Sequence, residues 1–433
     1  MNLIYGELMD RTQSLEALGT IGESVCRTLT TGGLPVKKVV DACEALSGEM
    51  NEEDHVPALM ARGMTKQKAC DELRLAKAML RREYLETRLK HEFYELPGGR
   101  DTFVPYGGAS RVVQLWKPLG VLLHIAAGNV EALPAFSVIE GLLTGNINIL
   151  KLPGMDDGLS TGLLRKLMQI EPLIRDYVYV FDYPSEDVES IKKMTNVADA
   201  VVVWGSDAAI SAVRRMVKPD TRIIEWGHRI SFAYVSGDSI RDEALEGIAH
   251  NICETEQLFC SACQGIYLDT DDMDAVFCFA ERFISVLNDV AASQARELPA
   301  VLQAQKTIEL YTEKLESVSA DKRVYRAAGC SVIASSDSRP ETSYMFRNCW
   351  IKPLPKERLI STLLPCKNHL QTVALICTKT RRAELEALLL ATGVVRLTDG
   401  QNMSQDYCGM PHDGEFALRR YMKRVSIEYA DVF

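Results

Sequence analysis

The chain has 433 residues, of which 47% are hydrophobic and 25% are charged, and this is the composition of a folded globular protein. Its formal net charge is −10 and no run of Lys and Arg stands out, which argues against a nucleic-acid partner. Its longest apolar runs, such as GVLLHIAAG, are far shorter than the ~20 residues that a membrane span needs. We therefore expect a globular protein with two or three domains of roughly 150 residues and no membrane span.

The first residues and the cysteines indicate the compartment. The opening stretch, MNLIYGELMDRTQSLEAL, lacks the basic segment followed by an apolar segment that marks a signal peptide. Without such a signal, we expect a cytoplasmic protein whose 12 scattered cysteines are reduced. Most of these thiols should be small buried hydrophobes, so a cysteine alone is no sign of function.

Residues 1–95 have a helical pattern. In PVKKVVDACEA (35–45) and over residues 66–90, apolar residues recur three and four positions apart, with Arg and Glu between them. This pattern predicts a helical layer that covers a sheet. The Gly-rich segment PGGRDTFVPYGG (97–108) then ends the helices.

Between residues 111 and 226, apolar β-branched runs alternate with helical segments. The expected strands are RVVQLW (111–116), GVLLHIAA (120–127), NINILKL (146–152), YVYVFDY (177–183), AVVVW (200–204) and TRIIEW (221–226). Such runs are typical of a parallel sheet with helices on both faces. We expect a doubly wound nucleotide-binding domain, although no G-x-G-x-x-G follows its strands, which excludes the simplest dinucleotide site.

A second α/β unit should follow an amphipathic helix over residues 243–256. Its expected strands are GIYLDT (265–270), VALICT (373–378) and GVVRLT (393–398). The predicted organisation is an N-terminal helical layer with a dinucleotide-binding domain over 1–256, a catalytic domain over 257–400 and a C-terminal segment over 401–433. The final strand, SIEY (426–429), could join either sheet, with the cofactor domain as the candidate.

Four stretches lie at the ends of buried strands, which is the edge where open α/β sheets bind ligands. They are HIAAGNVEA (124–132), GNINILKLPG (145–154), WGSDAA (204–209) and IIEWGH (223–228). Followed by a cysteine, their order resembles the aldehyde dehydrogenase superfamily over roughly residues 110–270. Within it, EWGHRISF (225–232), the cysteine segment with Gln264, and CGMPHDG (408–414) resemble the LuxC-type acyl-CoA reductase family, the long-chain fatty-acyl-CoA reductases. The resemblance implies an aldehyde-dehydrogenase-like fold of two doubly wound domains.

The resemblance also implies three catalytic residues. Cys260 would be the nucleophile, Asn129 the amide that faces the developing oxyanion, and Glu225 the general base. The residue types suit these roles independently, because a thiolate is a strong nucleophile and its thioester accepts hydride readily. An amide donor can stabilise the oxyanion that forms at the acyl carbon.

For the cofactor, the resemblance implies that Lys151 touches the adenosine ribose and that Gly205 and Ser206 form the turn that meets the pyrophosphate. A serine at a helix start offers backbone N–H groups to a phosphate without a glycine fingerprint. Gly154 stands where NAD-preferring aldehyde dehydrogenases carry a glutamate that grips the ribose hydroxyls. Because that carboxylate would repel a 2′-phosphate, NADPH is the expected cofactor, with NADH as the alternative.

These residues also have purely structural interpretations. Asn129 suits a turn, and Lys151 beyond a strand could simply be solvated. Glu225 could pair with Arg222 or Arg229, and Arg229 could instead bind a phosphate. Their joint occurrence in the order of the superfamily favours the functional interpretation.

The segment QLFCSACQGIY (257–267) carries two thiols three residues apart. A structural zinc site needs four ligands, usually in two separated pairs. His250 and Cys253 could complete a set with Cys260 and Cys263, but their spacing is uncommon and no second CxxC exists. A thioredoxin-like motif would follow a strand, whereas this one precedes a strand. We therefore expect no metal site, with Cys260 as the nucleophile and Cys263 as a neighbour.

The predicted function is the NADPH-dependent reduction of an acyl thioester to an aldehyde through acyl-Cys260. Aldehyde oxidation or acyl-phosphate reduction on the same scaffold is the enzymatic alternative. A zinc- or redox-regulated binding protein on a degenerate dehydrogenase fold is the alternative from another class. The expected partners are acyl-CoA or another acyl thioester, an acyl-activating enzyme as an alternative donor, and further copies of the chain in a homo-oligomer.

Overall fold

The computed structural model describes residues 1–61, 64–93, 100–104, 111–126, 132–154, 158–237, 240–294, 298, 300–316 and 321–428. The chain forms two compact units, the first comprising Met1–Gly227 with Cys408–Phe433 and the second His228–Tyr407. The division therefore falls after Gly227 and Tyr407, whereas the sequence placed it after residues 256 and 400. The difference arises because the strand that follows Gly227 is central to the second unit.

A seven-stranded sheet forms the centre of the first unit, in the order β2-β1-β7-β6-β5-β8-β9. The strands are β1 Asn2–Ile4, β2 Glu7–Met9, β5 Val121–Ile125, β6 Ile147–Lys151, β7 Val178–Phe181, β8 Ala200–Trp204 and β9 Arg222–Trp226. From β7 to β9 all pairs are parallel, whereas the β1–β2 hairpin joins β7 antiparallel. The chain runs outward from β5 to β7 and returns to β8 beside β5, which creates a topological switch point between β5 and β8.

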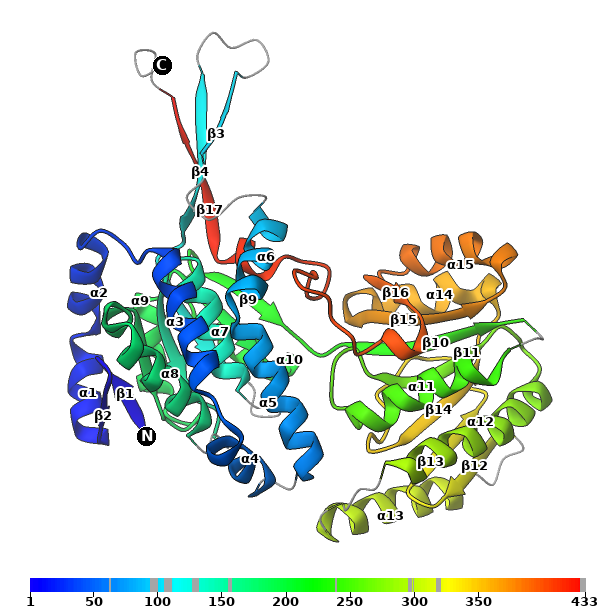
Figure 1. Cartoon of the computed structure of the whole chain (residues 1–433). Helices are drawn as coiled ribbons and strands as arrows, with labels where there is room; N and C mark the ends of the chain where they lie inside the picture. Colours follow the sequence, from blue (N-terminus) through cyan, green and yellow to red (C-terminus); the bar gives the residue numbers. More distant parts are fainter. Residues whose placement is uncertain are drawn as a thin grey trace. The chain divides into compact units, whose positions relative to one another are not determined.

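Helices cover this sheet (Figure 1). They are α1 Arg11–Gly19, α2 Ile21–Thr30, α3 Val36–Glu49, α4 Glu52–Ala61, α5 Lys66–Leu80, α6 Arg82–Phe93, α7 Leu133–Leu143, α8 Leu159–Ile170, α9 Val188–Val197, α10 Asp207–Met216 and α16 Ala417–Arg420, with the 3-10 helix η1 Pro172–Tyr177. Side-chain caps begin several of them, as Asp10 does in a capping box with Gln13. The predicted N-terminal helical layer packs with α7, α8 and one face of the sheet in a single apolar core.

A third, antiparallel sheet belongs to the first unit and has the order β17-β4-β3. Its strands are β3 Arg100–Phe103, β4 Val112–Pro118 and β17 Met422–Ile427. The predicted strand 111–116 thus lies outside the parallel sheet, in accord with the partial alternation of burial along β4. The C-terminal strand joins neither of the two sheets that the sequence offered, because its partner is β4.

The second unit is built on another seven-stranded sheet, in the order β12-β13-β14-β11-β10-β15-β16. Its strands are β10 Ile230–Ser236, β11 Cys263–Leu268, β12 Lys322–Ala327, β13 Cys330–Ser335, β14 Asn348–Pro353, β15 Leu370–Cys377 and β16 Arg396–Thr398. Its helices are α11 Asp242–Thr255, α12 Met273–Ser293, α13 Ala300–Glu316, α14 Leu359–Leu363 and α15 Lys379–Ala391, with 3-10 turns η2 Lys356–Arg358, η3 Leu364–His369 and η4 Gly400–Asn402. Only the β12–β13 pair is antiparallel, and separate apolar clusters form on the two faces.

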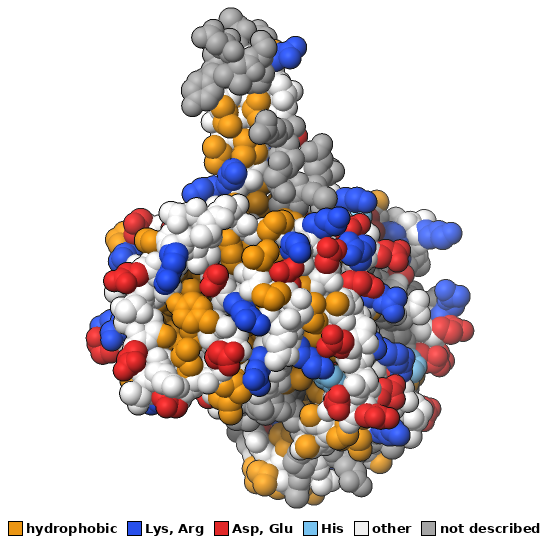
Figure 2. All heavy atoms as spheres, turned by 60° about the vertical axis from the view of Figure 1, so that its left-hand side comes forward, with side chains coloured by type: hydrophobic (Ala, Val, Ile, Leu, Met, Phe, Trp, Pro, Cys, Tyr) orange, Lys and Arg blue, Asp and Glu red, His pale blue; other side chains and the backbone are white. Residues whose placement is uncertain are grey.

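The surface carries charges of both signs. Figure 2 shows Lys and Arg interspersed with Asp and Glu over the face that it presents, with apolar side chains between them. Among the helices of the described ranges, none combines the length with the apolar character that crossing a bilayer requires.

Two helix glycines should respond oppositely to the same substitution. Gly162 is exposed in α8, and an added methyl group would meet no atom within 4 Å. Gly162→Ala should therefore raise the free energy of unfolding by about 0.5–1 kcal/mol, since alanine loses less backbone freedom on folding.

Gly141 is buried in α7, and a methyl group there would overlap the Oδ1 atom of Asn148, which accepts a hydrogen bond from His124 Nε2 (3.0 Å). We expect Gly141→Ala to lower the free energy of unfolding by about 1–3 kcal/mol, the usual range for overpacking. Urea denaturation of both variants measures the difference, and equal stabilisation by the two would contradict the close approach of α7 to β6.

Candidate active site

The predicted residues of the first unit lie at one edge of its sheet. Lys151 pairs with Ile125, Ile125 with Val203, and Val203 with Glu225, so these side chains form one row across four parallel strands. With strands ~4.8 Å apart, Lys151 and Glu225 stand roughly 14 Å from each other. This is the carboxyl edge, beside the switch point at which open α/β sheets bind ligands.

Gly205 and Ser206 lie between β8 and α10 at this switch point. Ser206 is the N-cap of α10, and its Oγ accepts a hydrogen bond from Ala209 N (3.4 Å). Gly205 N donates to Trp226 O (3.2 Å), which fastens the turn to β9. The exposed N–H groups at a helix start suit an anion, although Asp207 adds an acidic side chain to the first turn. Asn129, predicted to follow β5, lies outside the described residues.

Lys151 is not simply solvated. Its side chain is only 4% exposed, and Nζ donates to Ser185 Oγ (3.0 Å). Burial lowers the pKa of Lys151, while the negative charges of Glu186 and Asp182 act in the opposite direction. The negative charges of Glu186 and Asp182 would weaken the attraction of Lys151 for a bound anion.

Gly154 follows β6 at an exposed position, and a side chain there would meet no atom within 4 Å. The backbone therefore leaves room for a larger residue, including a carboxylate. Gly154 can be substituted to test cofactor choice without a steric penalty.

Glu225 has an ionic partner that the sequence did not identify. Arg214 on α10 binds its carboxylate through two hydrogen bonds, Nε to Oε1 (2.6 Å) and a terminal nitrogen to Oε2 (2.8 Å). The interaction with Glu225 raises the pKa of Arg214. The pair connects α10 with β9, so Glu225 has a structural role in this conformation.

The two arginines that the sequence offered to Glu225 bind elsewhere. Arg222 donates to the backbone oxygens of Arg420 (3.2 Å) and Met422 (3.4 Å). Arg229, which belongs to the second unit, donates to Asn368 O (2.6 Å). Arg214, which the sequence did not offer, is therefore the arginine that pairs with Glu225.

The CGMPHDG segment (408–414) contacts the last residues of β8 and β9. The His412 ring contacts Trp226 (centroids 4.8 Å apart) and Trp204 (5.4 Å), and the two indoles stack at 5.3 Å. The Arg420 guanidinium lies 4.6 Å from the Trp226 ring. The sequence marked this segment only by resemblance, because a contact across almost 200 residues leaves no local pattern.

In the second unit, Cys260 lies in the turn between α11 and β11, with its side chain half-buried. Buried Ser231 on β10 donates its Oγ hydrogen to Cys260 O (2.6 Å) and accepts from Thr372 N of β15 (3.0 Å). The turn is therefore attached to two central strands at their amino ends.

Cys263 is more deeply buried than Cys260. It is completely buried, its N–H donates to Asn251 Oδ1 (2.8 Å), and its Sγ donates to Gly265 O (3.2 Å). Burial raises the pKa of the Cys263 thiol to about 12. The Cys253 thiol, with its pKa also raised to about 12 by burial, is equally unsuited to act as a thiolate.

The zinc alternative gains no support from the described residues. His250 is exposed, and its Nδ1 lies 3.3 Å from Gln294 Nε2. Within the described ranges, no three side chains of His, Cys, Asp and Glu are arranged to hold a metal ion.

The fold is that of the aldehyde dehydrogenases, as the sequence predicted. A similar solved structure is the NADP-dependent glyceraldehyde-3-phosphate dehydrogenase of Bacillus halodurans C-125 complexed with NADP (TM-score 0.74, 14% identity, covering 99% of this chain and 98% of that one). Another is glyceraldehyde-3-phosphate dehydrogenase GapN of Methanocaldococcus jannaschii complexed with NADP (TM-score 0.72, 11% identity, 98% and 96%). At these identities the similarity defines the fold alone.

The acyl-CoA reductase (LuxC) family matches residues 33–424, and the chain therefore belongs to this family of oxidoreductases. A similar curated protein is the long-chain acyl-protein thioester reductase 2 of Photobacterium leiognathi, 29% identical over 163 residues, which are 37% of this chain and 34% of that protein. The long-chain acyl-protein thioester reductase of Aliivibrio fischeri is 27% identical over 176 residues (40% and 36%). The matched part spans about a third of these relatives. The predicted family is confirmed.

The different environments of the two thiols predict selective alkylation. At pH 8 a thiol with a pKa near 12 is ionised to only ~10⁻⁴, so iodoacetamide should modify Cys260 of the folded protein and leave Cys263 unmodified. Peptide mapping by mass spectrometry measures both, with exposed Cys278 as the positive control and urea-unfolded protein as the control for Cys263. Modification of folded Cys263 as fast as Cys278 would refute this assignment.

Proposed function

We propose that the protein reduces an acyl thioester to an aldehyde through a thioester on Cys260. The observation that carries the proposal is the half-buried Cys260 thiol in a turn fixed by Ser231, in a chain of the acyl-CoA reductase family. The relatives named long-chain acyl-protein thioester reductases support an acyl thioester as the substrate class. Acyl-CoA and a thioester presented by an acyl-activating enzyme are the two proposed donors.

In the proposed reaction, the Cys260 thiolate attacks the acyl carbon and forms a C–S bond, while the donor thiol leaves with a proton. A bound nicotinamide cofactor supplies the hydride. The C–S bond to Cys260 then breaks, which releases the aldehyde and regenerates the thiolate. The amide of Asn129 and the backbone N–H of Cys260 are the proposed donors to the oxyanion, which forms in both steps.

Glu225 is the proposed proton-transfer residue, and its ion pair with Arg214 bears on that role. The Arg214 side chain is 61% exposed, and that of Glu225 is 25% exposed. Water screens such pairs, so their net contribution to stability is small. The Glu225 carboxylate can therefore release Arg214 at a small cost in free energy. Its pairing with Arg214 is thus compatible with the proposed role as general base.

We place the nicotinamide cofactor on the first unit, at the carboxyl edge near the switch point. Lys151 would lie against the ribose, and Gly205 and Ser206 against the pyrophosphate. NADPH is preferred over NADH in this proposal, because Gly154 leaves no carboxylate next to the 2′-phosphate. The opposing influence is the negative charge of Asp182 and Glu186 near Lys151. The homo-oligomeric state and the cytoplasmic location stay predictions from the sequence.

The central experiment is acylation without cofactor. Incubation with a panel of acyl-CoAs should give one acyl adduct by intact-mass spectrometry, because attack by Cys260 precedes hydride transfer. The adduct should be absent in Cys260→Ser and retained in Cys263→Ala, and addition of NADPH should release aldehyde. An adduct on another residue, or acylation by acyl phosphates but not by acyl-CoA, would refute the proposal in its present form.

Cofactor choice is tested by kcat/KM for NADPH and NADH. We expect the native protein to favour NADPH and Gly154→Glu to reduce or reverse the ratio, because the new carboxylate repels the 2′-phosphate. Gly154→Gln is the matched control, since it adds the same volume without the charge. A native preference for NADH would contradict the proposal and would indicate that the negative charges of Asp182 and Glu186 repel the 2′-phosphate more than the missing carboxylate at Gly154 favours it.

A further inference from the structure

Two short segments of the second unit have a backbone that L-residues rarely adopt. Glu256 and Gln257 have φ angles of 52° and 62°, and Met345, Phe346 and Arg347 have φ angles of 58°, 51° and 68°. Non-glycine residues are disfavoured in this left-handed region, and they persist there only where surrounding contacts over-determine the backbone. The first segment leads directly into the turn that carries Cys260.

The two left-handed segments hold each other. Phe346 N donates to Glu256 O (3.0 Å), and a terminal nitrogen of Arg347 lies 3.2 Å from Glu256 Oε1. The side chains of Glu256 and Arg347 are 5% and 8% exposed, so this ion pair is buried. Removal of either partner would leave an uncompensated charge in the interior, which makes the contact between the segments strongly preferred.

Gln264 joins the turn to the second of these segments. Its buried side-chain amide donates to Gln257 O (3.0 Å) and Ala262 O (3.4 Å), on either side of Cys260. Its Oε1 accepts from both the backbone N–H (3.1 Å) and the hydroxyl (2.8 Å) of Ser343. One amide therefore closes the Cys260 turn and attaches it to residues 343–348, which we name the strap.

Gln257 makes the reciprocal connection from the other side of Cys260. Its Nε2 donates to Cys263 O (3.0 Å), and its Oε1 accepts from Asn348 N at the far end of the strap (3.1 Å). The side chain is 1% exposed. The turn is thus bound to both ends of the strap by two buried amides whose hydrogen bonds are satisfied.

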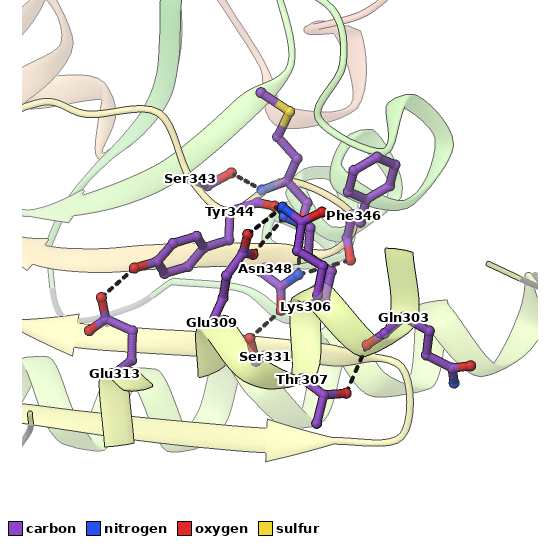
Figure 3. Close-up of polar contacts among 12 residues, drawn as sticks. Gln303, Lys306, Thr307, Glu309, Glu313, Ser331, Ser343, Tyr344, Phe346 and Asn348 are labelled. Carbon is purple, nitrogen blue, oxygen red and sulfur yellow. Dashed lines mark hydrogen bonds and ion pairs between the residues drawn. The ribbon is translucent and has the colours of Figure 1, made fainter. Parts of the chain in front are cut away.

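The outer side of the strap is held by α13 (Figure 3). Lys306 Nζ donates to Tyr344 O (2.5 Å) and to Glu309 Oε2 (2.7 Å), and it lies 5.4 Å from the Phe346 ring. The Tyr344 hydroxyl donates to Glu313 Oε1 (2.5 Å). The strap therefore lies between α13 and the Cys260 turn, with polar contacts on both sides.

From these contacts we infer that Gln257 and Gln264 are positioning residues that fix Cys260 for attack on the acyl carbon, with the strap as their support. The inference rests on the proposed role of Cys260 as nucleophile. Oriented attack is sensitive to small displacements, and a misplacement of about 1 Å can slow a reaction about 10²-fold. Gln257 and Gln264 touch neither substrate nor cofactor in this scheme and act through the turn.

The test uses variants of graded severity. Gln264→Met keeps the side-chain length and removes every hydrogen bond of the amide. Ser343→Ala is milder, because it removes the hydroxyl and leaves the Ser343 N–H bound to Gln264. Ser338→Ala is the matched control, since Ser338 precedes the strap, is similarly half-buried and donates to Pro353 O (2.8 Å) instead of to the turn.

Two reactions of Cys260 are compared in each variant, namely acylation by acyl-CoA in a single turnover and alkylation by iodoacetamide. Acylation needs an aligned oxyanion site, whereas a small alkylating reagent does not. We expect Gln264→Met to slow acylation about 10- to 100-fold and Ser343→Ala to slow it less. Alkylation should stay within about threefold of native in both, because alignment is not required. Ser338→Ala should be native in both reactions.

Native acylation rates in both Gln264→Met and Ser343→Ala would overturn the inference. So would parallel losses of acylation and alkylation together with a lowered Tm, because they would show a merely structural role. An absence of acyl adduct on Cys260 of the native protein with both proposed donors, acyl-CoA and an enzyme-bound acyl thioester, would instead refute the proposed function, and the inference with it. The acylation of Cys260 in the native protein therefore distinguishes failure of the proposed function from failure of the inference about Gln257 and Gln264.

Discussion

The register of β5 against its two neighbours is the constraint on which the candidate site of the first unit depends. At the start of β5, Gly120 N donates to Asn146 Oδ1 (2.9 Å) and Val121 N donates to Asp199 Oδ2 (2.8 Å). These two side chains precede β6 and β8, so one strand start is fastened on both sides. A slip of one residue between β5 and one of these neighbours would turn the side chains of the slipped strand to the opposite face of the sheet. Lys151 on β6 and Glu225 on β9 would then no longer lie in one row.

The same fastening extends to the C-terminal segment. Asn146 Nδ2 donates to Tyr421 O (3.0 Å), and the buried carboxylate of Glu92 accepts from Leu418 N (2.8 Å). Burial raises the pKa of Glu92, while its neighbour Arg88 acts in the opposite direction. Buried polar groups of this kind must be paired. The segment after residue 407 is therefore held in one specific position on the first unit. This return brings His412 to the Trp204–Trp226 pair.

The elements that the sequence predicted are those with a strong local pattern. The strands β5 to β8 are largely apolar and almost entirely buried, and burial on both faces is what such runs require. β10 was missed because Ser231 and Ser236 interrupt its apolar character, yet both are buried and hydrogen-bonded. β1 was missed because three residues within a helical region give no measurable period.

At the candidate site, local pattern and resemblance identified residue types but not their partners. The Glu225–Arg214 pair depends on how α10 lies against β9, and no spacing rule encodes that. The left-handed segments at 256–257 and 345–347 contain no glycine, although glycine is the residue that usually signals such a conformation. The strap was therefore invisible in the sequence, and Gln264 could be noted only as part of a family resemblance.

The chemistry of the groups that hold the Cys260 turn has a further consequence. Its hydrogen bonds come from amides, hydroxyls and backbone groups, such as those of Gln264, Gln257 and Ser231. None of these groups titrates between pH 5 and 10, so the ionisable groups that support the turn are those of the Glu256–Arg347 ion pair and of Lys306, Glu309 and Glu313 around the strap. A pH dependence of the proposed acylation would therefore have two sources, namely the ionisation of the thiol and of groups that move protons, and the ionisation of the charged side chains that hold the strap against the turn.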